Sequence, residues 1–361
     1  MKGWTRRKVL QRGALAGISS ALGLASCSKK PERVSQRTLR VYTWSDYLKP
    51  ELLQKFGEER GCRIVTDTFA SNEELFTALD AGLVSYDVIT PSSYMASLLH
   101  RIGKLQALDA SRIPNRRFMD AGYLTTAADP KMEYSVPFEL SVSGLAFVPE
   151  RHRPGMRSWR ALDEPAVAGR FSLLDDMREV LGAALKLTGA SVNATDEKEI
   201  QAAKEIAAGW IRKKRVLTSE NYKASLISGE DLLVHAYSGD VATVTGGKHK
   251  VEFFIPEEGA PMACDDFCIP KTAAAPDLAH VFINYFCDPK ISAANMEWSG
   301  YRAPIPEAVA LLPTSLKSNR VMFPDAAMLQ RCEPLRDLGD GLKVWQAAWG
   351  ELMAITSPPG R

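Results

Sequence analysis

Three apolar runs, each followed by a helical pattern, fill residues 38–99 and limit the fold more strongly than any other feature of the sequence. β-branched and aromatic residues predict three strands, at 38–42, 62–69 and 86–90. Helical patterns follow these strands, at 50–56, 71–79 and 91–99. This alternation predicts an α/β fold with a parallel sheet. Ligands of open α/β sheets bind beyond the carboxyl ends of the strands, which directs attention to the loop after the first strand.

This loop, Trp44 to Tyr47, offers two large aromatic rings, the Ser45 hydroxyl and the Asp46 carboxylate within four residues. Aromatic faces attract cations and a carboxylate pairs with an ammonium group, so the loop is a candidate site for a cationic ligand. The alternative is structural. In that case Trp44 and Tyr47 pack on the core, and Asp46 caps the helix that begins at Pro50.

The length of 361 residues predicts two lobes rather than one domain. Extended segments at 134–137 and 142–148 are expected to carry the first passage between the lobes, and a second α/β region follows from Arg170. The run from Asp265 to Pro270 is expected to carry the return. The expected lobes are residues 38–140 plus 268–308, and residues 141–267 plus 309–355.

Acidic side chains recur at the predicted ends of strands. Asp176, Asp240 and Asp265 join Asp46 as candidates to face one cleft, because each is expected where a parallel sheet opens. The structural alternative is that each acid caps a helix, and for each one taken singly it is the commoner case.

The first 26 residues are identified as a signal peptide. Thr5-Arg6-Arg7-Lys8-Val9-Leu10 is a twin-arginine pattern, and residues 13–26 are small, apolar and uncharged. Leu24 to Cys27 resembles the lipobox of bacterial lipoproteins. We therefore expect export, a lipid anchor on Cys27 that holds the protein at a membrane, and a polar tether at 28–37. The alternatives are an ordinary signal peptide with a chance cysteine, or an uncleaved anchor.

The formal charge of +2 is set by the signal peptide, which holds five basic residues and no acidic ones, so the rest of the chain carries −3. No basic tract with interleaved aromatic residues indicates a nucleic-acid partner. The five cysteines after Cys27 have no metal-ligand spacing, and we expect mostly buried thiols and no metal site. The sequence has no phosphate-binding glycine loop and no GxSxG or HExxH motif, so we expect neither a cofactor nor an enzyme.

A series of different short segments follows a specific order and spacing along the chain, from about Leu39 to Trp349. They are Trp44-Ser45-Asp46-Tyr47, Ser71-Asn72-Glu73, Tyr86-Asp87, Pro91-Ser92-Ser93-Tyr94, Tyr134-Ser135-Val136-Pro137, Ser158-Trp159, Asp176-Met177-Arg178-Glu179-Val180, Tyr237-Ser238-Gly239-Asp240, Pro256-Glu257-Glu258-Gly259, Asp265 with Pro270, Gly300-Tyr301 and Phe323-Pro324-Asp325-Ala326. In these segments the chain resembles the polyamine (spermidine/putrescine) substrate-binding proteins of bacterial ABC transporters.

The resemblance implies a two-lobed periplasmic-binding-protein fold of type II, with a mostly parallel sheet flanked by helices in each lobe and hinge strands between the lobes. It implies a periplasmic protein, expected as a monomer, that captures a polyamine between the lobes and delivers it to the membrane permease of an ABC importer. Carried over by position, the expected ligand-binding residues are Trp44, Ser45, Asp46, Tyr47, Ser92, Tyr94, Asp176, Glu179, Tyr237, Asp240, Asp265 and Tyr301. Aromatic rings would contact the methylene chain, and carboxylates would pair with the buried ammonium groups.

Three positions depart from the family pattern. Ala263 stands where an aromatic residue is usual, Tyr237 where tryptophan is usual, and Leu335 where spermidine binders carry a polar amide. These changes open space, so a bulkier or different amine is one alternative ligand. A zwitterionic solute is a second alternative if Arg178 or Arg302 faces the cleft acids. A membrane-tethered sensor that binds its ligand without import is a third.

Overall fold

The computed structural model describes residues 37–82, 84–245 and 250–356. The predicted signal peptide, Cys27 and all but the last residue of the predicted tether lie outside the described residues. The strands are β1 (Arg37–Trp44), β2 (Cys62–Phe69), β3 (Val88–Ile89), β4 (Ser135–Phe147), β5 (Phe171–Leu173), β6 (Val216–Leu217), β7 (Leu233–Tyr237), β8 (Glu252–Phe254), β9 (Pro261–Cys268) and β10 (Glu333–Pro334). The α-helices are α1 (Pro50–Arg60), α2 (Asn72–Ala81), α3 (Ser93–Arg101), α4 (Ala121–Leu124), α5 (Met177–Thr188), α6 (Glu197–Lys213), α7 (Tyr222–Ser228), α8 (Ser238–Val244), α9 (Pro276–Phe286), α10 (Pro289–Ser299), α11 (Pro306–Leu311), α12 (Thr314–Lys317), α13 (Ala326–Leu329) and α14 (Leu342–Thr356).

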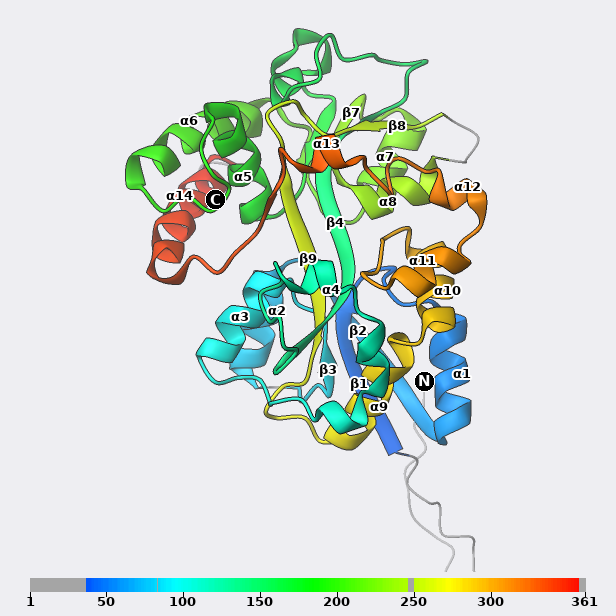
Figure 1. The fold of residues 1–361 in the computed structure, drawn as a ribbon. Helices are drawn as coiled ribbons and strands as arrows, with labels where there is room; N and C mark the ends of the chain where they lie inside the picture. The colour runs from blue at the N-terminus through cyan, green and yellow to red at the C-terminus, as the bar shows by residue number, and fades with distance from the viewer. Residues whose placement is uncertain (1–36, 83, 246–249, 357–361) are drawn as a thin grey trace, which may run out of the picture. The chain divides into compact units, whose positions relative to one another are not determined.

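The strands follow the order β2-β1-β3-β9-β4-β7-β5-β6, with β10 paired to β9 and β8 paired to β4 (Figure 1). β1 pairs in parallel with both β2 and β3, as the strand–helix alternation predicts. β9 and β4 enter the sheet antiparallel. Ser71 caps α2 by accepting a hydrogen bond from the Glu74 N–H, so the predicted helix start is confirmed.

β4 and β9 connect two groups of elements (Figure 1). The first part of β4 pairs with β9, and its last residues pair with β7 and β8. The sequence predicted two separate extended segments here, whereas the structure has one 13-residue strand with an irregular register between Pro137 and Glu139. Glu139 interrupts the apolar pattern of the strand. Its buried carboxylate instead accepts hydrogen bonds from Asn295 and Ser299, each 2.8 Å long.

Each group of elements has its own hydrophobic cores. In the group around β1, consecutive residues alternate between two cores: Val41 belongs to the core that holds Phe282 of α9, and Tyr42 belongs to the core that holds Leu75 of α2. In the group around β7, the fully buried Trp210 of α6 belongs to a core that also holds residues of α5 and α14. The predicted division of the chain between lobes stays a prediction; its first boundary falls inside β4.

The five cysteines after Cys27 are free and buried, as predicted: Cys62, Cys264, Cys268, Cys287 and Cys332. Among the helices of the described residues, none has both the length and the apolar character needed to span a bilayer.

Candidate functional site

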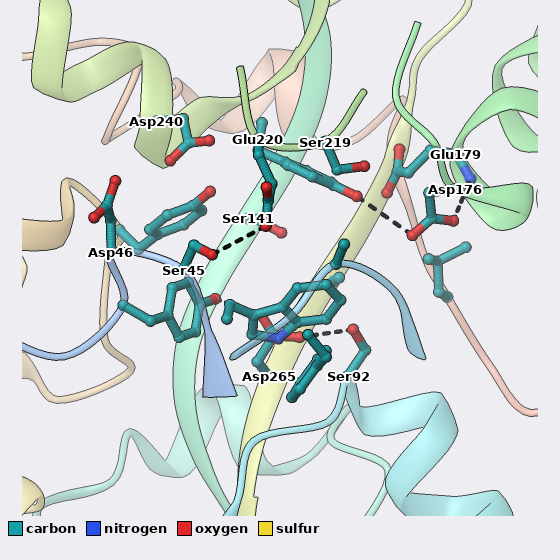
Figure 2. A pocket seen from close by; sticks show the side chains of 18 of the residues that line it. Ser45, Asp46, Ser92, Ser141, Asp176, Glu179, Ser219, Glu220, Asp240 and Asp265 are labelled. Atoms are coloured by element: carbon teal, nitrogen blue, oxygen red, sulfur yellow. Dashed lines mark hydrogen bonds between the residues drawn. The ribbon is translucent and has the colours of Figure 1, made fainter. Parts of the chain in front are cut away.

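A pocket lies where the two groups of elements face each other, beyond the carboxyl ends of β1, β3, β5 and β7 (Figure 2). The pocket and its open mouth together enclose about 730 Å³. All twelve residues predicted from the sequence line it: Trp44, Ser45, Asp46, Tyr47, Ser92, Tyr94, Asp176, Glu179, Tyr237, Asp240, Asp265 and Tyr301. The lining is completed by Phe69, Ala70, Ser141, Ser219, Glu220, Lys223, Ala263 and Leu335.

Asp265 reaches the pocket from within β9, so the prediction that it ends a strand was wrong. The expectation of a strand end failed because β9 already begins at Pro261 and runs antiparallel to β3 and β4. One carboxylate oxygen accepts a 2.6 Å hydrogen bond from the Ser92 hydroxyl, and the other accepts a hydrogen bond from the Tyr47 phenol. Burial raises the pKa of Asp265 to about 7, although these two hydrogen bonds oppose the shift.

Asp176 and Glu179 enter the pocket together from the first turn of α5 (Figure 2). The structural alternative is right for Asp176, which caps α5 by accepting hydrogen bonds from the N–H groups of Arg178 and Glu179. Its second oxygen accepts a 3.3 Å hydrogen bond from the Tyr237 hydroxyl, so the same carboxylate also serves the pocket. Burial, followed by the nearby Asp176 charge, raises the pKa of Glu179 to about 8.

These three carboxylates lack a charged partner of the opposite sign. Within the described part of the chain, Asp176, Glu179 and Asp265 form no ion pair with a lysine or arginine. His235 lies 3.8 Å from Glu179, but burial lowers the pKa of this histidine to about 3, so its ring is neutral. A cationic ligand would therefore meet buried acidic groups that have no direct ion pair with a lysine or arginine of the described chain.

The arginines considered from the sequence form no ion pair with these acids, although the nearby Arg178 charge opposes the rise that burial causes in the pKa of Asp176 and of Glu179. The Arg178 guanidinium donates hydrogen bonds to the Arg336 carbonyl and the Asn193 side chain, and it lies 4.7 Å from the Trp345 ring. Arg302 lies over the Phe323 ring. Neither arginine is among the described residues that line the pocket. Neither arginine therefore faces the pocket acids, as the zwitterionic alternative required.

The loop after β1 holds Asp46 in an unusual backbone conformation. Its φ of 56° lies in the left-handed region, which aspartate tolerates better than most residues. Lys49, not Asp46, occupies the N-cap position of α1, so the structural alternative for Asp46 was wrong. The structural alternative for Tyr47, that its ring packs on the core, was right in part. Tyr47 is 4% exposed and belongs to a core cluster as well as to the pocket.

The opposite side of the pocket carries a lysine and an acid that the sequence did not single out. Lys223 of α7 lies 3.2 Å from Asp240 and 3.7 Å from Asp46, measured from its Nζ to the carboxylate oxygens. Glu220 accepts a 3.2 Å hydrogen bond from the Ser45 hydroxyl (Figure 2). Sequence reasoning missed both residues, because charges at the start of a predicted helix look like an ordinary solvated surface.

Aromatic rings form the rest of the wall. The Trp44 and Phe69 ring centroids are 4.4 Å apart, and those of Tyr47 and Tyr301 are 5.1 Å apart. Three buried polar atoms of the lining have no hydrogen-bond partner in the described chain: Trp44 Nε1, Tyr94 Oη and Glu179 Oε2. Such orphaned atoms are rare in folded proteins and are expected where a ligand supplies the partners.

The same region offers no metal centre: across residues 37–82, 84–245 and 250–356, no group of three or more His, Cys, Asp or Glu side chains could hold a metal ion. The arrangement instead suits an organic cation, since it combines buried carboxylates, hydroxyl groups and aromatic faces.

The family model for the bacterial extracellular solute-binding proteins matches residues 51–323, and this chain belongs to that family. The family comprises solute-binding transport proteins and is not an enzyme family. The chain has the two-lobed periplasmic-binding-protein fold that its relatives share, as the sequence predicted.

A putrescine/cadaverine-binding protein of Pseudomonas aeruginosa is 32% identical over 313 residues, covering 83% of this chain and 88% of the relative. A spermidine/putrescine-binding periplasmic protein of Escherichia coli is 29% identical, with 98% of this chain and 99% of the relative covered. Among solved structures, a lipoprotein of Treponema pallidum is 32% identical, with a TM-score of 0.78 over 87% of this chain and 99% of that chain.

Proposed function

We propose that this protein captures a polyamine in the pocket and delivers it to the membrane permease of an ABC importer. The observation that carries the proposal is the set of three buried carboxylates, Asp176, Glu179 and Asp265, that have no lysine or arginine partner in the described chain. Burying an unpaired ammonium group is prohibitive, so a polyamine requires such acids. The names of the relatives from P. aeruginosa and E. coli support this class of ligand.

The proposed roles follow from position. Asp265 and the Asp176–Glu179 pair hold ammonium groups, with Ser92 and Tyr47 fixing the Asp265 carboxylate by their hydrogen bonds. The aromatic rings contact the methylenes and add cation–π attraction of about 0.5–2 kcal/mol each. Closure of the pocket over the ligand excludes water and strengthens these pairs.

Lys223 favours a second candidate ligand. Its ammonium group is the one described cation in the lining and could pair with a ligand carboxylate, as a zwitterionic solute would require. Lys223 is already paired with Asp46 and Asp240, while three buried acids have no ion pair with a lysine or arginine. A purely cationic solute would therefore pair with more of the charged groups in the pocket than a zwitterion would.

We also propose that the protein is exported through the twin-arginine signal and anchored by a lipid on Cys27. The motif Leu24-Ala25-Ser26-Cys27 supports this, as does the similarity to a lipoprotein of T. pallidum. In cells, Cys27→Ser should release the protein from the membrane fraction, and replacement of Arg6 and Arg7 by lysine should block export. Unchanged membrane attachment of the Cys27→Ser protein would contradict the anchor.

A thermal-shift screen of the mature protein tests the ligand class, because a ligand that binds the folded state raises its apparent stability by about 2.7 kcal/mol at one hundred times its Kd. The panel contains putrescine, cadaverine, spermidine, 4-aminobutyrate and the common amino acids. We expect stabilisation by one or more polyamines. Stabilisation by 4-aminobutyrate or amino acids alone would favour the zwitterion candidate and reject the polyamine proposal.

Delivery needs a separate measurement. Uptake of a radiolabelled polyamine into cells should fall when the gene for this protein is deleted and return when it is restored. Normal uptake in the deletion strain, with ligand binding intact in vitro, would indicate binding without import.

A further inference from the structure

Lys223 is set apart by its position, since it is the one cation among the described residues that line the pocket. Its side chain is 21% exposed, and its Nζ lies between Asp240 Oδ1 at 3.2 Å and Asp46 Oδ2 at 3.7 Å. Asp46 follows β1 and Asp240 belongs to α8, so the lysine joins residues from the two groups of elements. Figure 2 shows these two carboxylates on the same side of the pocket.

Both carboxylate oxygens of Asp240 are already engaged in this arrangement. One oxygen receives the Lys223 ammonium, and the other accepts a hydrogen bond from the Tyr222 hydroxyl. The Asp240 side chain is only 15% exposed. A ligand ammonium group that approaches Asp240 must share this carboxylate with Lys223, and it meets a like charge at close range.

The two sides of the pocket therefore differ in charge. Asp176, Glu179 and Asp265 are buried without a lysine or arginine partner in the described chain, whereas Asp46 and Asp240 already share an ammonium group. Ammonium groups of a ligand meet no lysine on the first side, whereas on the second side they meet the like charge of Lys223 beside Asp46, Asp240 and Glu220. Such a repulsive element discriminates between ligands that differ in the number of their charges.

We propose that Lys223 determines specificity by occupying the position that a third ligand ammonium group would need, so that the pocket selects diamines over triamines. This inference rests on the proposed polyamine function. A diamine can place both of its ammonium groups against Asp176, Glu179 and Asp265. A triamine such as spermidine carries its remaining ammonium group onward to Lys223 and must push the lysine away from Asp240.

Isothermal titration calorimetry of putrescine and spermidine tests this with four proteins: the wild type, Lys223→Met, Lys223→Arg and Lys198→Met. Removal of the pocket charge in Lys223→Met should raise the spermidine affinity relative to the putrescine affinity about tenfold or more, as expected for loss of a like charge at contact distance. Lys223→Arg keeps the charge and should keep the wild-type ratio. Lys198 is exposed on α6, so Lys198→Met changes the net charge equally and should leave the ratio unchanged. Lys223→Gln provides a second neutral variant if the methionine variant folds poorly.

An affinity ratio in Lys223→Met and Lys223→Gln equal to or below that of the wild type would overturn the inference. So would tighter wild-type binding of 4-aminobutyrate than of putrescine with loss of that preference in Lys223→Met, because Lys223 would then recognise a carboxylate. Binding of any polyamine by the wild type decides the proposed function, and the change in ratio decides the role of Lys223. Absence of all polyamine binding by the wild type would reject both.

Discussion

Ser92 donates a 2.6 Å hydrogen bond to Asp265, a residue 173 positions later in the chain. Ser92 stands at the N-cap position of α3, yet its side chain makes no capping hydrogen bond. A serine at an N-cap usually stabilises the helix by about 1 kcal/mol through that bond. Here the hydroxyl instead donates its hydrogen bond to a carboxylate of the pocket. This indicates that Ser92 contributes to the binding site and not to the capping of α3.

Asp265→Asn should remove most of the ligand binding while the fold is kept. The variant loses the charge that pairs with an ammonium group, and breaking a buried charged pair of this kind costs about 2–5 kcal/mol. Asp80→Asn is the control, because Asp80 is exposed on α2 and pairs with Lys104 outside the pocket. The measurement is the ligand-induced shift in Tm, and a wild-type shift in Asp265→Asn would contradict the site.

Asp46→Asn should weaken binding much less than Asp265→Asn. The Asp46 side chain is 73% exposed and its pair with Lys223 is 3.7 Å long, so water screens its charge. We expect a loss of no more than about 1 kcal/mol, measured by calorimetry. A loss equal to that of Asp265→Asn would show that Asp46 becomes buried when the ligand is bound.

The free energy of unfolding of the ligand-free protein should fall as the pH rises from about 4 to about 8 through the contribution of Asp265 and Glu179. In the folded chain burial raises the pKa of Asp265 to about 7 and that of Glu179 to about 8. In the unfolded chain the corresponding pKa values are about 3.9 for aspartate and about 4.3 for glutamate. The folded state therefore binds more protons in this interval, and each carboxylate that ionises without a partner destabilises it. Denaturant titrations at several pH values should show a smaller decrease for Asp265→Asn than for the wild type.

The affinity for a diamine should change with pH in the opposite sense. Ionised carboxylates attract the ligand, whose ammonium groups stay protonated, so binding should strengthen as the pH rises through about 7 and should release protons from Asp265 and Glu179. Calorimetry in buffers of different ionisation enthalpy measures this release. An affinity independent of pH between about 5.5 and 8 would be inconsistent with these pKa directions.

Gly239→Ala should weaken binding without unfolding the protein. A Cβ at this position would lie 2.3 Å from atoms of the Tyr301 ring, so the ring must move within the pocket. We expect about a tenfold loss of affinity. Gly209→Ala is the matched control on α6, where the added Cβ would meet nothing within 4 Å; it should leave binding unchanged and stabilise the helix by about 0.5–1 kcal/mol. Wild-type affinity in Gly239→Ala would mean that the Tyr301 position does not matter for binding.

Glu139→Gln should be tolerated and Glu139→Ala should not. Burial raises the pKa of Glu139 well above its usual range, which favours the neutral acid, and glutamine matches the neutral acid in charge and shape. Alanine leaves Asn295 and Ser299 without their shared acceptor, and we expect a loss of about 2–4 kcal/mol in denaturant titrations. Because Asn295 also binds the Tyr47 carbonyl, ligand affinity should fall as well. Equal stability of the two variants would show that this acceptor contributes little.

Much of the site could be predicted because its residues lie in short segments with strong local patterns. Trp44 ends a clear strand, Ser45 to Tyr47 come directly after it, and Asp176 begins a clear helix. The order of elements therefore predicted that these residues lie at the edge of a sheet. Lys223 and Glu220 could not be found in this way. Their role depends on contact with a loop far away in the sequence, and nothing in their local pattern records it.

The strand–helix alternation, the family resemblance and the side chains at the pocket could all be read from the amino-acid sequence, since they depend on local periodicity and on ordered short segments. Which carboxylates pair with a lysine became visible only in the folded chain. Asp240 receives a lysine from a neighbouring helix, whereas Asp265 receives only hydroxyl groups. The physical reason is that charge pairing and burial depend on distances of a few ångströms between residues that are far apart in the chain.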